Sequence, residues 1–429
     1  MGGAELSAAA SGAGAGGAVV PPAGPGRNLV RDHARAERRR RLQAIGLVAP
    51  LFLFLLFSFV GPIADMLRRS VYDMDLAGVW PRTAAAMHAW DGNGLPPDSA
   101  FAALGADIRA SAEAGRVAVA AQRLNYPISG GRSLVMNMAR RVEADDFKPP
   151  ADWRAAFLDA DPAWGSAETW SAIRRASGPV TDYFLLNALD LHKDAAGHIS
   201  RAPDGIFLSI LWRTFSISGV VTLFALLLGY PLAYVMTHSS GRVAAVLTLF
   251  VLLPFWTSLL VRTAAWIVLL QDQGIINKAL MAIGLIDHPV RLMFNRVGVV
   301  IAMVHVLLPF MVLPLAAVMR GIRPETVRAA RSLGAHPWTA FRRIYVPQTM
   351  PGVGAGVLLV FISAIGYYIT PALVGGADDQ MLSYFIAFYT NETVNWGLAA
   401  ALAVVLLAAT AVLAAIYARV VASRGGLVT

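Results

Sequence analysis

The 429-residue sequence contains no cysteine. This absence excludes disulfide bonds, thiolate metal sites and cysteine nucleophiles, although it does not identify the cellular compartment. No Gly-x-x-x-x-Gly-Lys-Ser/Thr motif occurs, and no lysine follows a glycine anywhere in the chain. Since that motif forms the loop that holds nucleotide phosphates, we expect any nucleotide hydrolysis to take place in another chain.

Residues suited to metal binding or catalysis lack the necessary spacing. The eight histidines form no His-Glu-x-x-His motif or other ligand pattern, which argues against a zinc site. No nucleophile and base are placed for a membrane-embedded enzyme, so we predict no catalytic residue, no metal, no cofactor and no enzymatic activity. His305 lies in an apolar run. We expect it to be a core histidine that is hydrogen-bonded to a neighbouring helix.

Charged residues are scarce. They make up 15% of the chain, whereas 56% of the residues are hydrophobic and the mean hydropathy is +0.56, a balance typical of membrane proteins. The net charge of +9 could indicate a nucleic-acid partner. The charges lie in short segments between apolar runs, however, so we predict a partner lipid bilayer and no nucleic acid.

The N-terminal region is read as a tail followed by a membrane anchor. Residues 1–37 begin with a Gly/Ala/Pro-rich stretch, and we predict a disordered cytoplasmic tail there. Segment 38–67 contains an apolar run, 42–63, long enough to cross about 30 Å of hydrocarbon. A cleaved signal peptide is the alternative, but the run is long for one and has no small-x-small cleavage site. We therefore predict a first transmembrane helix.

Residues 204–424 are predicted to form a five-helix core. Their apolar runs are 206–236, 243–270, 297–319, 353–373 and 396–421. With the anchor, these runs predict an all-α integral membrane protein with six transmembrane helices. None of the runs contains an aspartate or glutamate. A secondary transporter with paired intramembrane carboxylates is therefore the weaker alternative.

The positions of the arginines predict the orientation. Arginines gather before the first helix and in the connection 320–348, whereas the connections 271–296 and 374–395 are mixed or acidic. Positive residues favour the cytoplasmic side of a membrane. We therefore expect a multi-pass protein of the bacterial inner (cell) membrane with both termini in the cytoplasm.

A polar insert, residues 68–203, separates the first two predicted helices. Its short amphipathic stretches, such as 107–123 and 133–142, predict a mainly helical domain. The orientation makes this domain extracytoplasmic. Because both of its ends are membrane helices, we expect it to lie over the mouth of the bundle, where it would dock a partner, guard the mouth or stabilise the complex.

The connection 320–348 carries the most informative motif. Arg328-Ala329-Ala330 is followed by three residues and Gly334, and then by nine residues and Ile344-x-x-Pro347. Two small alanines let a short helix lie close to a partner surface, and Gly334 permits a left-handed turn that ends the helix. The spacing resembles the EAA loop of ABC importer permeases, Glu-Ala-Ala, three residues, Gly, nine residues, Ile-x-Leu-Pro.

Two positions depart from that pattern. Arg328 replaces the usual Glu, and Val346 replaces the usual Leu. The second change is conservative. The first reverses a charge where the resemblance implies contact with an ATP-binding subunit, and Glu325, one turn earlier, is a candidate to take its place.

The resemblance extends over roughly residues 211–400. Five stretches are similar to the spermidine/putrescine permease family, namely 228–234, 254–257, 284–287, 291–294 and 307–315. The resemblance implies the type I ABC importer permease fold. It also implies a subunit that forms half of the translocation path for a small cationic solute, most simply a polyamine. Another small solute, such as an opine, an amino-acid derivative or a thiamine-like cation, is the alternative.

The partners follow from the same resemblance. They are two ATP-binding subunits, a second homologous permease and an extracytoplasmic solute-binding protein. The loop residues that the resemblance assigns to contact with the ATP-binding subunit are Arg328, Ala329, Ala330, Gly334, Ile344 and Pro347.

The candidate substrate path consists of Trp256, Arg262, Tyr367 and Tyr368. Arg262 is an ionisable group within an apolar run, but its sign is wrong for a polycation, so pairing with a carboxylate or capping a helix end is the alternative. Tyr367 and Tyr368 precede a proline that we expect to break the helix. Their rings suit ammonium groups, although an aromatic belt beside an acidic loop is an equal interpretation.

Overall fold

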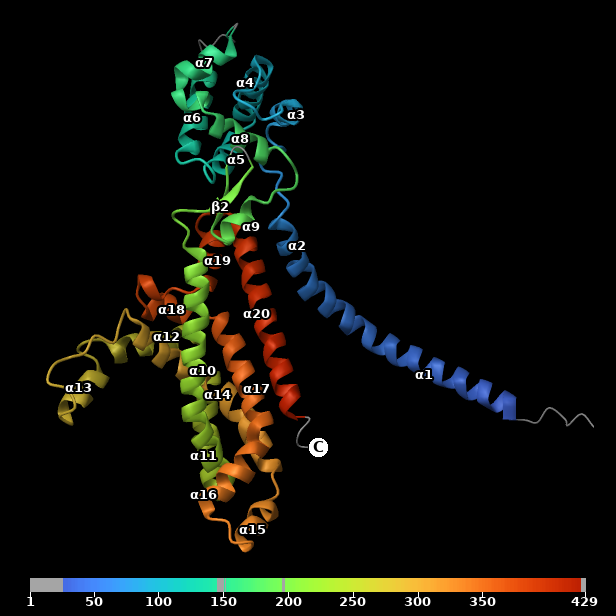
Figure 1. The fold of residues 1–429 in the computed structure, drawn as a ribbon, viewed down its shortest axis with the longest axis vertical. Helices are drawn as coiled ribbons and strands as arrows, with labels where there is room; N and C mark the ends of the chain where they lie inside the picture. The colour runs from blue at the N-terminus through green and yellow to red at the C-terminus, as the bar shows by residue number, and fades with distance from the viewer. Residues whose placement is uncertain (1–25, 145–149, 151, 195–196, 426–429) are drawn as a thin grey trace, which may run out of the picture. The chain divides into compact units, whose positions relative to one another are not determined.

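The computed structural model describes residues 26–144, 150, 152–194 and 197–425. The chain divides into two compact units, Met1–Asp65 and Met66–Thr429, which are described separately (Figure 1). Helix α1 (Gly26–Leu55) continues through the π-helical turn η1 (Leu56–Val60) into α2 (Gly61–Arg69), and the first unit ends within α2.

The start of α1 differs from the predicted tail. Residues 26–37 are helical, and three arginines and two alanines among them favour helix. Residues 1–25 of the predicted tail lie outside the described residues.

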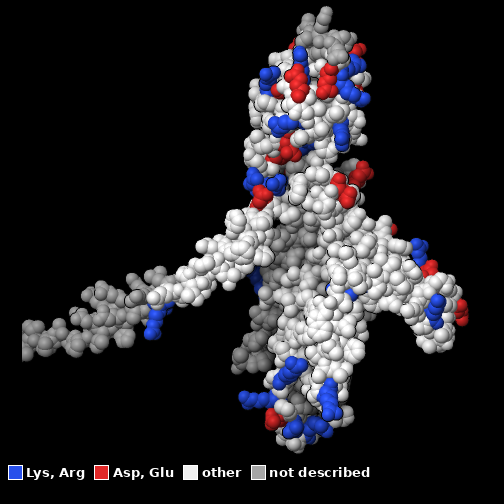
Figure 2. Space-filling view, turned by 180° about the vertical axis from the view of Figure 1, so that it is seen from behind, with Lys and Arg blue, Asp and Glu red and all other residues white. Residues whose placement is uncertain are grey.

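Six segments of the described chain are long and apolar enough to cross a membrane, as the sequence predicts. They are Gln43–Arg69, Phe207–His238, Leu259–Ala282, Arg296–Gly321, Pro337–Ile365 and Trp396–Arg419. The surface of the second unit agrees with this assignment. On the face shown in Figure 2, charged residues gather at its two ends and at the tip of a side projection, and the rest of the surface is mostly uncharged.

The predicted single helix 243–270 is wrong, because two helices occupy it. Helix α11 (Gly241–Trp256) ends where Thr257 becomes extended, and α12 (Leu259–Leu270) begins after Ser258, which is also extended. Two side chains stabilise this break. The Thr257 hydroxyl donates to the carbonyl of Pro254 (3.2 Å), and the Arg262 guanidinium donates to the carbonyl of Thr257 (3.2 Å). Backbone groups freed inside a membrane need such partners.

The predicted run 353–373 is also divided, here at the expected place. Helix α17 (Val346–Ile365) stops before Gly366, and α18 (Ile369–Val374) follows. Pro371 lies in the first turn of α18, where a missing N–H removes no helical hydrogen bond. Helix α14 (Arg296–Gly321), in contrast, runs without a break through both of its internal prolines.

Three helices form the centre of the bundle: α10 (Phe207–His238), α14 and α17. Their mutual faces bury side chains completely, including Val221, Met303 and Met311. Gly352 and Gly356 of α17 lie directly against α14, as their Gly-x-x-x-Gly spacing predicts. A Cβ atom at Gly352 would lie 3.2 Å from the carbonyl oxygen of Pro314.

Gly356→Leu should therefore push α14 and α17 apart. A Cβ atom there would lie 2.7 Å from the sulfur of Met311 and 3.2 Å from its carbonyl oxygen. Overpacking of this kind costs about 1–3 kcal/mol, which should appear as a lower melting temperature in detergent. The matched control is Gly219→Leu in α10, where a Cβ atom meets nothing within 4 Å. An equal melting temperature for both variants would contradict the close packing.

The insert folds mainly as helices around its own hydrophobic core. They are α3 (Pro81–Ala89), α4 (Asp98–Glu113), α5 (Val117–Leu124), α6 (Gly131–Glu143), α7 (Trp153–Ala160), η2 (Pro162–Gly165), α8 (Ala167–Ala176) and α9 (Tyr183–Ala188). Trp164 and Trp170 are fully buried in this core, and the ring of Trp170 meets that of Phe101 edge-on at 4.4 Å. The Oδ2 atom of the buried Asp107 accepts hydrogen bonds from the backbone amide and the hydroxyl of Thr83, which satisfies that oxygen.

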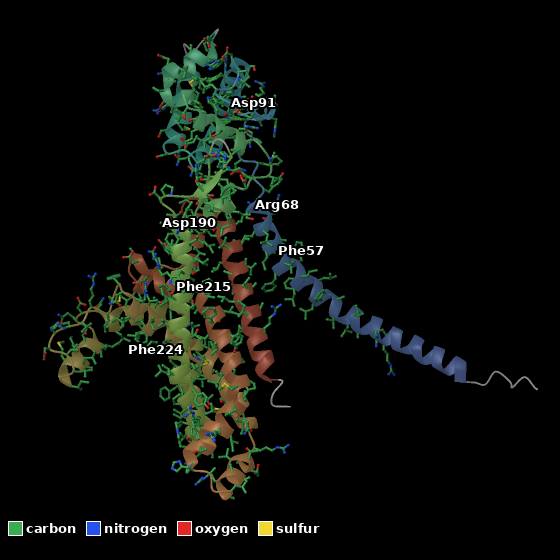
Figure 3. The ribbon with its side chains drawn as sticks, viewed as in Figure 1. Phe57, Arg68, Asp91, Asp190, Phe215 and Phe224 are labelled. Carbon is green, nitrogen blue, oxygen red and sulfur yellow. The ribbon has the colours of Figure 1, made fainter. Side chains whose placement is uncertain are left out.

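The insert joins the bundle through α9 and a short hairpin, β1 (Leu191–Lys193) with β2 (Ile199–Arg201). Asp190 precedes β1 and is labelled beside the start of α10 in Figure 3. Its carboxylate accepts hydrogen bonds from the first two amides of α10, those of Phe207 and Leu208, each at 2.8 Å. Phe184 of α9 packs against Gly397 of α20 (Trp396–Gly425). The insert is thus attached to both α10 and α20.

Candidate functional site

The predicted motif forms a helix with a defined end. Helix α15 spans Pro324–Ser332, and Gly334 has a φ of +89°. The Ala335 amide donates to the carbonyl of Ala330 (3.1 Å), and the Gly334 amide donates to that of Arg331 (3.0 Å). This pair of bonds is the Schellman motif, which closes helices with a left-handed residue. The left-handed turn predicted at Gly334 is confirmed.

The same segment presents an open surface. No residue of α15 is buried, and the Arg328 and Ala329 side chains are exposed, with Ala330 partly buried. Leu333 is 89% exposed, although it is apolar. After α15, the short helix α16 (Pro337–Ala340) carries Trp338, which is 63% exposed. An exposed apolar surface of this kind is typical of a protein-protein contact.

Arginines surround this surface. They are Arg320, Arg323, Arg328, Arg331, Arg342 and Arg343, and all are exposed. Figure 2 shows basic side chains gathered at this end of the unit. Glu325 lies in the first turn of α15 and Arg331 in its last turn. Both positions suit the helix dipole.

A row of stacked aromatic rings connects this surface to α10. Trp338 stacks on Phe341 (5.7 Å between ring centroids), and Phe341 stacks on Tyr345 (5.6 Å). Tyr234 of α10 meets both Phe341 and Tyr345 edge-on, and it stacks on His238. We call Trp338, Phe341, Tyr345, Tyr234 and His238 the aromatic row.

The aromatic row was not predicted from the sequence. Residues 338, 341 and 345 have helical spacing, as do 234 and 238. The sequence could therefore have indicated that each set lies on one face of a helix. Phe341–Tyr345 forms a π-helical turn, η3, that leads directly into α17. Ile344 and Pro347 of the motif lie in η3 and in the first turn of α17, Ile344 partly buried and Pro347 exposed.

A second group of residues lies beside the two helix breaks. The hydroxyls of Thr263 in α12 and Thr370 in α18 are 3.3 Å apart. The indole of Trp266 donates to His305 of α14 (3.2 Å), which confirms the expected core histidine. Arg262 is near enough to interact electrostatically with both His305 and Tyr367.

Of the predicted path residues, Arg262 and Tyr367 are within electrostatic reach of each other. Arg262 caps the end of α11, as one of its two alternatives predicted, and its Nε is buried with no hydrogen-bond partner. Tyr367 packs partly buried against the bundle core, whereas Tyr368 is exposed. Trp256 is 72% exposed. Within the part of the chain that the structure describes, no hydrogen bond or ring contact joins it to the other three.

The acidic loop beside Tyr368 is already engaged. Asp379 is buried and forms an ion pair with Arg296 at the start of α14 (3.1 Å).

Within residues 26–144, 150, 152–194 and 197–425, no group of three or more His, Asp or Glu side chains is placed to hold a metal ion.

Residues 206–424 match the family of binding-protein-dependent transport system inner membrane components. The spermidine/putrescine transport system permease protein PotB of Haemophilus influenzae is 35% identical over 214 residues, which cover 50% of this chain and 75% of that protein. PotB of Escherichia coli is 33% identical over 220 residues, 51% of this chain and 80% of that protein. The insert precedes the matched residues.

Solved structures include a bacterial ABC transporter involved in the import of the acidic polysaccharide alginate. It has a TM-score of 0.44 and 17% identity, and it covers 51% of this chain and 79% of that chain. The family match takes in half of the chain, and the relatives are matched over three quarters of their length or more at above 30% identity. The chain is therefore a membrane protein of the binding-protein-dependent transport system inner membrane component family.

Proposed function

We propose that this chain is the transmembrane permease subunit of an ATP-driven importer and forms half of the path for a small cationic solute. The exposed surface at α15 and α16 carries the proposal, because a membrane helix connection with unburied Leu333 and Trp338 requires a partner. The names of the PotB relatives support a polyamine as the solute.

The ATP-binding subunit is the partner assigned to this surface. The segment 320–348 acts as a coupling loop, with Arg328, Ala329, Ala330 and Gly334 at the contact. Closure of two such subunits around ATP would move the loop, and the aromatic row would carry that movement into α10. Hydrolysis takes place in those subunits, and a second homologous permease completes the path.

The orientation follows from the charges. Cytoplasmic connections carry an excess of arginine, so the coupling loop and both termini face the cytoplasm. The insert then faces the other side, where a solute-binding protein delivers the solute. The substrate path passes the helix breaks, where Arg262, Tyr367 and the Thr263–Thr370 contact lie. Broken helices at this depth are typical of transporter sites.

Gentle purification from the native membrane tests the assembly. We expect recovery of an ATPase, a second permease and a solute-binding protein that binds radiolabelled spermidine or putrescine. Recovery of an ATPase without polyamine binding would support the importer but would indicate a different small solute. A chain that purifies alone and transports in ATP-free vesicles would be a secondary transporter and would refute the proposal.

Leu333→Ser tests the contact itself. Burying a leucine contributes about 1.5–3 kcal/mol, so the variant should retain roughly one tenth or less of the co-purified ATPase. Leu285→Ser is the matched control, since Leu285 is also exposed (69%) beside a helix-ending glycine, Gly284, with a φ of +72°. Equal ATPase recovery with both variants would place the contact elsewhere.

A further inference from the structure

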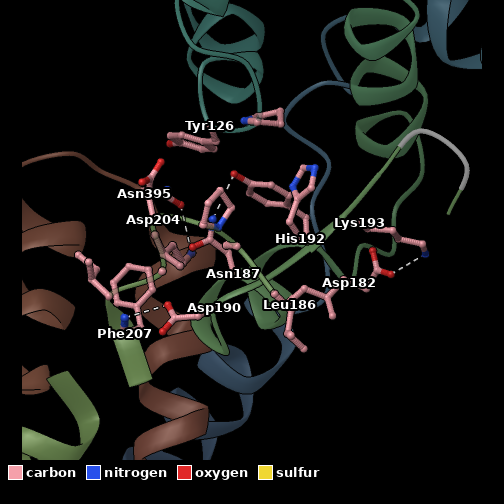
Figure 4. Close-up of a pocket in the computed structure, with 18 of the residues that line it drawn as sticks. Tyr126, Asp182, Leu186, Asn187, Asp190, His192, Lys193, Asp204, Phe207 and Asn395 are labelled. Atoms are coloured by element: carbon pink, nitrogen blue, oxygen red, sulfur yellow. Dashed lines mark hydrogen bonds and ion pairs between the residues drawn. The ribbon is translucent and has the colours of Figure 1, made fainter. Parts of the chain in front are cut away.

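A cavity of about 720 Å³ lies where the insert meets the bundle (Figure 4). The insert contributes Tyr126, Tyr183 and Asn187, and the bundle contributes Phe207, Tyr389 and Asn395. None of these residues was singled out in the sequence, because they come from distant segments. The volume is in the range of small-molecule sites.

The cavity is lined by ionisable side chains, most of which already have a partner. They are the aspartates Asp182, Asp190 and Asp204 and the basic residues Arg175, His192 and Lys193. Lys193 is already paired with Asp182 (2.8 Å), and the two are joined at one edge of Figure 4. The Arg175 guanidinium donates to the carbonyl of Asp194 (3.2 Å).

Two of the three aspartates are also engaged. Asp182 forms an ion pair with Lys193, and Asp190 accepts hydrogen bonds from the two amides at the start of α10. Asp204 is exposed, and its carboxylate makes no ion pair or hydrogen bond with any described residue. It is thus the lining carboxylate that is open to a ligand.

A second layer of carboxylates lies behind Tyr126. Burial raises the pKa of the Tyr126 hydroxyl, and the carboxylates of Asp75 and Asp73 raise it further, against an opposing effect of Arg123. These carboxylates are therefore within electrostatic reach of the cavity wall. Since Asp73 is paired with Arg123, Asp75 is the carboxylate of this layer that adds to the attraction for positive charge.

Aromatic rings supply the second requirement of an ammonium site. Phe207 and Tyr389 meet edge-on at 6.1 Å between centroids. Tyr126 also lines the cavity, whereas the ring of Tyr183 already has the Arg123 guanidinium over it at 5.1 Å. Ring faces attract ammonium groups, most strongly where water is excluded. A site with rings and an open carboxylate fits an alkylammonium chain better than an anion or a neutral solute.

We propose that the cavity between the insert and the ends of α10, α19 (Leu382–Asn391) and α20 binds a small alkylammonium cation, with Asp204 as its counter-ion. The inference rests on the proposed function, because it makes this cavity a receiving site that the solute enters before the bundle. The insert would then be a specificity element that the matched part of the family lacks.

Equilibrium dialysis of radiolabelled spermidine with the full chain in lipid nanodiscs tests the site. Asp204→Asn keeps the Asp-Gly turn, since asparagine suits the same turn position, and removes only the charge. A partly exposed ion pair contributes about 1 kcal/mol, so we expect a roughly fivefold higher Kd. Tyr389→Leu should raise the Kd by a similar factor. Glu113→Gln, at an exposed position in α4, is the matched control and should bind as wild type.

Ligand competition separates the chemical classes. Putrescine should displace spermidine, whereas the neutral 1,4-butanediol and a dicarboxylate should not. Unchanged binding by Asp204→Asn, no spermidine binding by the wild-type chain, or displacement by the dicarboxylate would each overturn the site. ATP-driven spermidine uptake by the wild-type assembly is measured in parallel. Uptake without binding at the cavity refutes this inference alone, whereas absent uptake refutes the proposed polyamine function.

Discussion

Gly334→Val is expected to reduce ATP-driven uptake to background while the chain remains in the membrane. A β-branched residue at a φ of +89° costs about 1–2 kcal/mol. The chain can relieve that cost by unwinding the last turn of α15, which would displace Leu333 and the two alanines. Uptake of labelled spermidine, in cells without other polyamine carriers, measures the effect, and membrane fractionation measures the amount of protein.

Gly321→Val is the matched control for this variant. Gly321 ends α14 just before α15, and a Cβ atom at either glycine meets nothing within 4 Å. The two positions differ in backbone conformation, because only Gly334 has a positive φ. Gly321→Val should therefore keep most of the uptake. Full uptake by Gly334→Val would refute the coupling role of this turn.

Asp73→Ala is expected to destabilise the insert by about 3–5 kcal/mol, because it leaves a buried arginine without its partner. Asp73 and Arg123 form an ion pair with both side chains almost fully buried, at 5% and 2% exposure. One Arg123 nitrogen, Nη1, already has no hydrogen-bond partner. The Arg123 guanidinium also lies over the rings of Tyr183 and Phe184, so the change should loosen the attachment of α9.

Thermal unfolding followed by tryptophan fluorescence checks this expectation, since Trp80, Trp164 and Trp170 are buried in the insert core. Asp159→Ala is the matched control. It removes the partner of Arg141 in an ion pair of the same insert that is exposed on both sides, where a pair contributes about 0–1 kcal/mol. Similar melting temperatures for both variants would show that the buried pair does not hold the insert together.

Features that depend on neighbouring residues along the chain were predictable. The apolar runs predicted six membrane segments, because backbone groups in hydrocarbon can be satisfied only within helices or closed sheets. The left-handed turn at Gly334 was predictable for a similar reason, since the turn uses hydrogen bonds within six residues. The prediction of a single helix at 243–270 failed because apolar composition does not reveal where extended residues interrupt a helix.

The break at Thr257 depends on a long side chain and not on backbone hydrogen bonds alone. Its carbonyl is satisfied by Arg262, five residues further on, which explains how an arginine inside an apolar run is stabilised. The same sequence interpretation left two alternatives for Arg262 open, and the geometry selected the helix cap. The prolines of α14 show the opposite case, because a helix packed on several sides stays continuous through both of them.

The sequence by itself determined the membrane class, the family resemblance, and the motif around Gly334 with its helix end. Each depends on composition or on short-range spacing, which local physics constrains. Only the tertiary structure decided that the aromatic row connects α16 with α10, that the Thr263 and Thr370 hydroxyls meet, and that Asp204 borders a cavity with Tyr126 and Tyr389. Those contacts join segments separated by tens to hundreds of residues, and packing between helices alone brings them together.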